Sequence, residues 1–190
     1  MLKKQKSTNS NFKILKFLFF SPIFLSSSFF TIISESKAGL EFQWDQSSGL
    51  KQLKWFQKDN RPRFRNNIFL FLRPRDRATG LLKINLTLPK RYQKISLKEE
   101  NISLCKVRIG GYETRTKCLE GVPADIEIKD DKSSLDIYPY KPIPLNKDSY
   151  AIVLKLINPK RSGLYQFHSF GQPTGESVST YLGSWTKVLD

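Results

Sequence analysis

Apolar residues in this chain recur at every second position far more often than at helical spacing. Between residues 82 and 88, leucine and isoleucine alternate with lysine, asparagine and threonine, which gives one apolar and one polar face. Residues 67–73 (NIFLFLR) and 150–157 (YAIVLKLI) are short and almost continuously apolar, as expected of strands that are buried on both faces. A chain with this pattern is predicted to fold into β-sheets.

Turn residues separate these runs from further strand candidates. The further candidates are residues 42–44, 126–128, 135–137, 164–170 and 178–188. Three prolines make residues 138–145 an extended link, because proline cannot donate to a β ladder. Residues 90–101 are the one place where a helical turn is expected. We therefore predict an all-β fold, a β-sandwich of the immunoglobulin-like or Greek-key kind with about 8–9 short strands.

The first 38 residues have the three parts of a secretory signal. Five lysines precede or enter an apolar run at residues 14–33, and Ser36 and Ala38 supply the small side chains that a peptidase needs before the cut. The basic end stays on the cytoplasmic side while the apolar run enters the bilayer as a helix. We predict a signal helix within residues 1–38 and a single β-sandwich domain over residues 39–190. Its predicted location is the periplasm, the cell envelope or the outside of the cell.

The same apolar run could instead be an uncleaved membrane anchor at residues 14–33, because a spanning helix needs about 20 residues. Pro22 and the serines at positions 26–28 weaken it as a span. Cleavage after Ala38 is the favoured interpretation. Of the chain's 32 basic and 17 acidic residues, six lysines and one glutamate precede this cut, which leaves 26 basic and 16 acidic residues, a net charge of +10.

Both cysteines lie in a hairpin candidate that reads ISLCKVRI, GGYE and TRTKCL. Export permits oxidation, and two cysteines suffice for one bridge. If residues 110–113 form a four-residue loop, Ile109 faces Thr114 and Cys105 lies directly opposite Cys118, within reach of a disulfide. A two-residue loop would place the cysteines diagonally, about 7–8 Å apart, which is marginal. We predict a Cys105–Cys118 disulfide; the alternative is two buried, unpaired thiols.

Several segments of the second half resemble one known family. They are residues 103–107 (SLCKV), 116–120 (TKCLE), 122–124 (VPA), 142–144 (PIP), 150–154 (YAIVL), 158–159 (NP) followed by 163–167 (GLYQF), and 181–185 (YLGSW). Together they resemble the cyanobacterial family of domains of unknown function DUF2808. The resemblance implies an exported, mostly-β envelope protein from a cyanobacterium. It implies no activity.

His168 is the single histidine of the chain and the one candidate catalytic residue considered. A serine hydrolase would need it as the general base, yet no Gly-X-Ser-X-Gly elbow is present. A zinc site would lack ligands once the cysteines are bridged. The acidic residues between 125 and 136 fit no EF-hand spacing, so a solvated turn is favoured over calcium. We predict no catalytic residue, metal or cofactor. A hydrolase that uses His168 and a nearby carboxylate is the alternative from another class.

Basic residues concentrate in residues 51–77, with Trp55, Phe56 and Phe64 among them. The candidate anion-binding residues are Arg61, Arg63, Arg65, Arg73, Arg75 and Arg77. An exported protein rarely meets nucleic acid, so anionic polysaccharide or a membrane surface is the better partner for clustered arginines. A solvated, solubilising surface is the simpler interpretation. Three tryptophans could form a sugar-stacking platform, although Trp185 lies in a strand and is expected to pack in the core.

The leading functional hypothesis is therefore a non-enzymatic envelope protein that binds a partner or serves structurally, with the partner unknown. The alternative within binding is a module for anionic polysaccharide or lipid headgroups that uses residues 51–77.

Overall fold

A computed structural model describes residues 50–190. The predicted signal at residues 1–38, the alternative anchor at residues 14–33 and the strand candidate at residues 42–44 lie outside the described residues. Among residues 50–190, no helix is long and apolar enough to span a bilayer.

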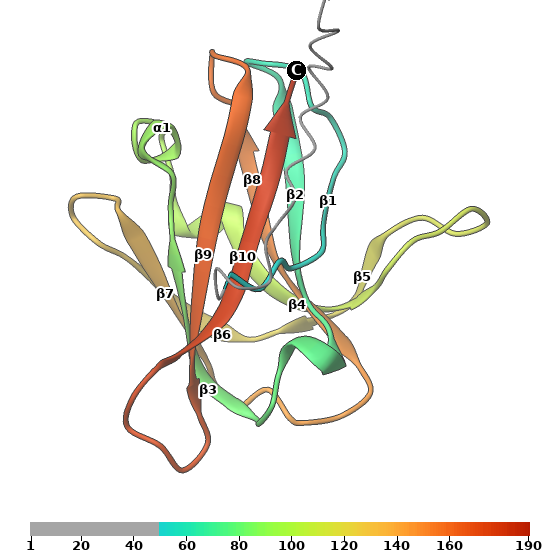
Figure 1. Cartoon of the computed structure of the whole chain (residues 1–190), viewed down its shortest axis with the longest axis vertical. Helices are drawn as coiled ribbons and strands as arrows, with labels where there is room; N and C mark the ends of the chain where they lie inside the picture. Colours follow the sequence, from blue (N-terminus) through green and yellow to red (C-terminus); the bar gives the residue numbers. More distant parts are fainter. Residues whose placement is uncertain (1–49) are drawn as a thin grey trace, which may run out of the picture. The chain divides into compact units, whose positions relative to one another are not determined.

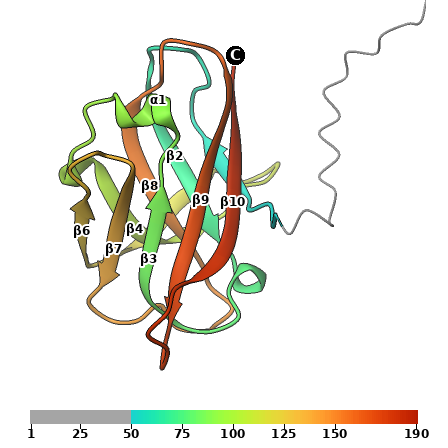
Figure 2. The same ribbon diagram turned by 60° about the vertical axis from the view of Figure 1, so that its left-hand side comes forward.

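Two antiparallel sheets of five strands each pack face to face, which confirms the predicted β-sandwich (Figure 1 and Figure 2). In spatial order, the first sheet contains β1 (Trp55–Gln57), β2 (Arg65–Leu72), β8 (Ser149–Ile157), β4 (Ile102–Arg108) and β5 (Lys117–Val122). The second contains β10 (Thr180–Leu189), β9 (Gly163–Pro173), β3 (Leu81–Thr87), β7 (Ser134–Pro139) and β6 (Ala124–Ile128). The described part of the chain thus has ten strands, slightly more than the 8–9 predicted.

Helical structure is confined to short connections. The predicted helical turn is confirmed as α1 (Lys90–Gln93) and the 3-10 turn η3 (Glu99–Asn101). A second 3-10 turn, η2 (Pro74–Asp76), joins β2 to β3. In both views, α1 lies at the end of the sandwich that also holds the C-terminus (Figure 1 and Figure 2).

The main core fills the space between the two sheets. Strand alternation directs every second side chain of each strand inward. The inward-facing residues include Ile68, Leu70, Leu72, Leu104, Ile152 and Leu154 from the first sheet and Ile84, Leu86, Leu135, Ile137, Phe167 and Trp185 from the second. Trp185 is fully buried, as expected, and its indole nitrogen donates a 3.2 Å hydrogen bond to the Phe71 carbonyl of the opposite sheet. This bond ties the two sheets together across the core.

A second apolar cluster lies on the outer face of the first sheet. It consists of Phe71, Cys105, Val107, Ala151 and Val153, with Phe69 and Ile109 packed against it. These residues alternate along β2, β4 and β8 with the main-core residues, so both faces of these strands are apolar. The nearly continuous apolar runs predicted this double burial.

The predicted Cys105–Cys118 disulfide is present, with 5.7 Å between the Cα atoms. The predicted strand register, in which the two cysteines lie directly opposite each other, was wrong. Cys118 pairs with Val107, whereas Cys105 pairs with Gly121. A bulge on β5 near Leu119 adds a residue between these pairs. A bulge bends its strand and increases the local twist, so a diagonal pair can still be bridged.

A smaller irregularity occurs at the start of β3. The pairing with β9 shifts between Leu81 and Lys83. As a result Leu81 is buried and Leu82 is 37% exposed, although Leu82 was expected on the apolar face.

The chain before β1 crosses from one sheet to the other. The Leu53 amide donates to the Ser184 carbonyl and the Ser184 amide donates to the Lys51 carbonyl, both at 2.7 Å. Gly183 permits this approach, because a Cβ atom there would lie 2.7 Å from the Lys51 carbonyl oxygen. The crossing covers part of the β10 edge, which would otherwise present unpaired backbone groups.

Candidate binding surface

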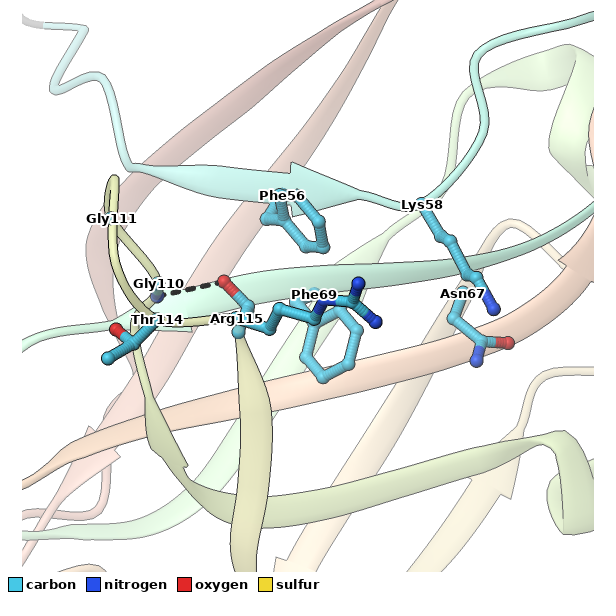
Figure 3. A pocket seen from close by; sticks show the side chains of 9 residues that line it. Phe56, Lys58, Asn67, Phe69, Gly110, Gly111, Thr114 and Arg115 are labelled. Carbon is cyan, nitrogen blue, oxygen red and sulfur yellow. Dashed lines mark hydrogen bonds between the residues drawn. The ribbon is translucent and has the colours of Figure 1, made fainter.

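A groove of about 650 Å³ lies on the outer face of the first sheet (Figure 3). We call it the outer groove. Its lining comes from β1, β2 and the connection between β4 and β5, and consists of Phe56, Lys58, Asn67, Phe69, Gly110, Gly111, Thr114, Arg115 and Thr116. A cleft of this size, with an apolar base and a few polar groups, is the usual form of a ligand site.

Two phenylalanines contribute aromatic surface to the outer groove. Phe56 and Phe69 are paired directly across β1 and β2, so their side chains share the outer face. Their ring centroids lie 6.0 Å apart at an interplanar angle of 48°. Phe56 remains 40% exposed. The groove therefore offers an accessible aromatic surface to a ligand.

The wall opposite β1 is the long connection between β4 and β5. The Gly110 amide donates to Thr116 Oγ1 at 2.9 Å (Figure 3). The Gly111 amide donates to the Thr114 carbonyl, also at 2.9 Å. A Cβ atom at Gly110 would lie 2.6 Å from the Thr116 backbone nitrogen, so glycine is required there. These contacts close the loop tightly, and the disulfide holds β5 to β4 beside it.

The charged side chains that line the outer groove are both cations. Lys58 and Arg115 are exposed. Figure 3 shows the Arg115 side chain beside Phe69 and the Lys58 side chain extending toward Asn67. None of the nine lining residues is Asp or Glu. Strands β1, β2, β4 and β8, which form most of the sheet, contain no acidic residue either. Glu113, next to Thr114, and Asp59, next to Lys58, are the nearest acidic residues in the sequence, and neither lines the groove. The charged side chains that line the groove are thus all cations.

The positive charge continues from the groove toward one end of the sandwich. Asn67 pairs with Lys155, and Arg65 pairs with Ile157 two residues further along. Lys155 and Arg65 are both exposed. From Phe69 toward the start of β2 at Arg65, the side chains of the outer face thus change from aromatic to cationic.

The six predicted anion-binding arginines fall into two groups at opposite ends of β2. Arg61, Arg63 and Arg65 lie at its start, and all three are exposed. Arg61 forms an ion pair with Asp59 at 2.6 Å, and its guanidinium lies 3.7 Å from the Phe64 ring centroid. This pairing lowers the pKa of Asp59 to about 2. None of these three arginines lines the outer groove.

The other three arginines follow β2, about 25 Å away along the strand. Arg73 Nε contacts Asp76 Oδ2 at 2.7 Å, and Arg73 Nη2 donates to Asp76 Oδ1 at 3.0 Å. Arg77 is 3% exposed and donates to the Pro144 and Asp148 carbonyls at 2.6 and 2.7 Å. Burial lowers the pKa of Arg77. Arg75 alone of these three is exposed.

His168 lies on β9, on the outer face of the second sheet. Its Nδ1 is 2.7 Å from Ser184 Oγ, and the Tyr181 hydroxyl is 2.6 Å from the same oxygen. Ser184 is 2% exposed. Within residues 50–190, His168 forms no hydrogen bond or ion pair with a carboxylate. His168, Ser184 and Tyr181 thus form a chain of hydrogen bonds, and the serine at its centre is buried.

Metal-binding groups do not gather in the described region. No three His, Cys, Asp or Glu side chains of residues 50–190 converge as ligands. In the acidic segment, Asp125 accepts a hydrogen bond from Tyr140, and Asp136 pairs with Lys83 at 2.9 Å.

Fold and surface together define a small all-β sandwich protein. A sequence model of the family "Protein of unknown function (DUF2808)" matches residues 42–187. The chain belongs to this family, as its sequence resemblance implied. No curated protein matches the sequence.

Some solved structures have a similar arrangement of strands. The bacterial hydrophobin BslA is 13% identical, with a TM-score of 0.46 over 74% of this chain and 95% of that one. The collagen-binding domain of a Staphylococcus aureus adhesin is 13% identical, with a TM-score of 0.37 over 71% and 95%. The collagen-binding subdomain of the Enterococcus faecalis surface protein ACE is 9% identical, with a TM-score of 0.36 over 70% and 94%.

Proposed function

We propose that this protein is an exported, non-enzymatic module that binds an anionic polysaccharide along the outer groove. The observation that carries the proposal is the combination of Phe56 and Phe69 with Lys58 and Arg115, in a groove whose lining contains no carboxylate. Aromatic rings pack against the apolar faces of sugar rings, and cations bind their carboxylate or sulfate groups. Arg65 and Lys155 would contact further units of an extended polymer.

Two features support a location outside the cytoplasm. The cross-strand disulfide is of a kind that persists in oxidising compartments. The basic and apolar leader has the composition of a secretory signal. A C-terminal fusion to a reporter that matures only outside the cytoplasm tests this location. An inactive reporter in cells that contain the full-length fusion would contradict it.

Affinity electrophoresis in gels containing polygalacturonate, an acidic polysaccharide, tests the binding. We expect the wild-type protein to be retarded in these gels and to run freely in gels containing neutral dextran. Retardation should weaken as salt rises, because exposed charges are screened. Arg115→Glu and Phe56→Ala should each lower the apparent affinity about tenfold, equivalent to about 1.4 kcal/mol.

The matched control is Lys147→Glu, which reverses an exposed charge in the connection between β7 and β8. It changes the net charge as much as Arg115→Glu does. Equal weakening by both variants would show that net charge alone governs retardation, and the groove proposal would be wrong. Unchanged retardation of Phe56→Ala would exclude the aromatic contact.

A further inference from the structure

The end of the sandwich that holds the C-terminus carries a second concentration of positive charge. Figure 1 and Figure 2 both show the connection between β1 and β2 beside the connection between β8 and β9 at this end. The Arg63 amide donates to the Asn158 carbonyl at 3.2 Å, and the Asn158 amide donates to the Phe64 carbonyl at 2.9 Å. We call residues 58–65 and 157–164 together the cationic end.

These two segments contain six basic residues and one acidic residue. The basic residues are Lys58, Arg61, Arg63, Arg65, Lys160 and Arg161, and all six are exposed. Asp59, the acidic one, is already paired with Arg61. Asp190 lies nearby and accepts a hydrogen bond from Asn60. The balance of charge at this end is therefore strongly positive.

Helix α1 adds cations to the same end. Tyr92 of α1 packs edge-on against Tyr165, with ring centroids 5.3 Å apart, and the Tyr165 hydroxyl donates to the Arg161 carbonyl. These contacts connect α1 to the second segment of the cationic end. Lys90, Arg91 and Lys94 are exposed on and just after α1, which contains no acidic residue.

Exposed apolar side chains lie among these cations. Phe64 is 47% exposed and Ile157 is 49% exposed. Leu164 and Val188 are each 43% exposed and face each other across β9 and β10. Binding of a soluble anionic polymer does not require exposed aliphatic side chains. A bilayer interface, in contrast, accommodates apolar groups beside the charges of the headgroups.

The backbone of the cationic end is held from beneath by two buried asparagines. Asn158 Nδ2 donates to the carbonyls of Asp59 and Arg61 at 3.1 and 2.9 Å. Asn66 Oδ1 accepts from the amides of Lys58 and Asp59. The exposed side chains are therefore presented on a fixed framework, which reduces the entropy lost on binding.

We propose that the cationic end docks the protein on the surface of an anionic lipid bilayer. The basic side chains lie at headgroup level, and Phe64 with its apolar neighbours enters the interface between them. Cations attract an anionic leaflet, and apolar insertion adds the second contribution that stable peripheral binding needs. Lys58 and Arg65 are the residues that this surface shares with the proposed polysaccharide site. The variants below change neither of them, so the two proposals can fail independently.

Site-specific fluorescence on the full chain tests the docking. Both native cysteines are bridged, so a cysteine introduced as Ser162→Cys at the cationic end can carry an environment-sensitive dye. Ser177→Cys, in the connection between β9 and β10 at the other end of β9, is the matched control. We expect vesicles of phosphatidylcholine with about 30 mol% phosphatidylglycerol to shift the dye emission to the blue at position 162 and not at 177. About 0.5 M salt should reverse the shift.

Charge reversal identifies the groups responsible. In the Ser162→Cys background, Arg63→Glu, Lys160→Glu and Arg161→Glu together should abolish the shift. These three side chains are exposed and make no ion pair within the described residues, so folding should be preserved. The control reverses Arg75, Lys141 and Lys147, which are exposed and lie outside the cationic end, and should retain the shift.

Several outcomes would overturn the proposal. An equal shift with pure phosphatidylcholine vesicles would show that anionic headgroups are not what the protein binds. An equal shift at position 177 would show that another part of the chain brings the protein to lipid. Loss of the shift in the control triple variant would show that net charge alone is responsible. Polygalacturonate binding that depends on Arg63, Lys160 and Arg161, with no vesicle response, would assign this end to polysaccharide. Arg115→Glu should leave the vesicle response unchanged, which separates this test from that of the groove.

Discussion

Lys187 Nζ donates a 2.8 Å hydrogen bond to the hydroxyl of Tyr92, with both side chains buried. The ammonium also donates to Asn158 Oδ1 at 2.9 Å. Within residues 50–190 it forms no ion pair with a carboxylate. Burial lowers the pKa of Lys187 to about 8. A cation inside the sandwich thus joins β10, α1 and the connection after β8 through neutral partners alone.

The unpaired Lys187 predicts a specific pH dependence of stability. Its pKa is about 8 in the folded protein and about 10.5, the ordinary lysine value, in the unfolded chain. Between these values the unfolded state binds more protons, so the free energy of unfolding rises with pH. We expect a contribution of about 2 kcal/mol between pH 7 and 9.5, as an upper estimate. Denaturant unfolding across this range measures the rise.

The matched variant for this test is Lys187→Met with Tyr92→Phe, which removes the ammonium and the hydroxyl it would leave without a partner. The rise with pH should disappear in the double variant, because the titrating group is gone. An equal rise in both proteins would show that other groups produce it.

Asn158 is predicted to be the most sensitive polar position of the cationic end. Its side chain donates to the carbonyls of Asp59 and Arg61 and accepts from Asn66 and Lys187. Asn158→Ala should lower the free energy of unfolding by about 2–4 kcal/mol, because several buried polar groups lose their partners. Thermal and denaturant unfolding give the value.

Hydrogen exchange provides a local measurement of the same change. The amide of Arg63, which is bonded to the Asn158 carbonyl, should exchange faster in Asn158→Ala as the loop loosens. The control is Asn60→Ala, because the one hydrogen bond of that side chain is exposed and its loss should change stability by less than about 0.5 kcal/mol. Comparable losses in both variants would contradict the central role of Asn158.

The disulfide is predicted to contribute about 3 kcal/mol, because it closes a short loop in the unfolded chain. Cys105→Ala with Cys118→Ser should lower the free energy of unfolding by about this amount. Reduction of the wild-type protein should have a similar effect, and reductant should not affect the double variant. A loss below about 1 kcal/mol would show that β4 and β5 are held together by pairing and packing alone.

The β-sandwich could be predicted because alternation is a local property of each strand. Residues 82–88 have the period of a strand whatever they pair with, and the short apolar run at residues 150–157 indicates a strand that is buried on both faces. The register of β4 and β5 around the two cysteines was harder to predict, because one bulged residue near Leu119 shifts every later cross-strand pair. Only the twist and packing of the assembled sheet determine where such a residue is accommodated.

The candidate groove depends on contacts between segments that are distant in the sequence. Phe56 and Phe69 meet through the register of β1 and β2, and Arg115 joins them through the path of the hairpin. No local sequence pattern indicates these contacts. The burial of Lys187, by contrast, follows from a local pattern. Lys187 lies two residues from both Trp185 and Leu189 and shares the core-facing side of β10 with them. The period-two rule accounts for its inward position, although Lys187 was not among the residues predicted to be buried.

Arg77 and Arg75 provide a test of which predicted arginines are structural. Arg77 is buried, lies over the Tyr150 ring and holds two backbone carbonyls, whereas Arg75 is exposed. Arg77→Met should lower the free energy of unfolding by about 2 kcal/mol, because the Pro144 and Asp148 carbonyls lose their donor. Arg75→Met should change it by less than about 0.5 kcal/mol. Neither should alter polygalacturonate affinity in folded protein, since both lie outside the groove. Weakened binding in Arg77→Met with unchanged stability would instead assign Arg77 a ligand, and the division between the two ends of β2 would be wrong.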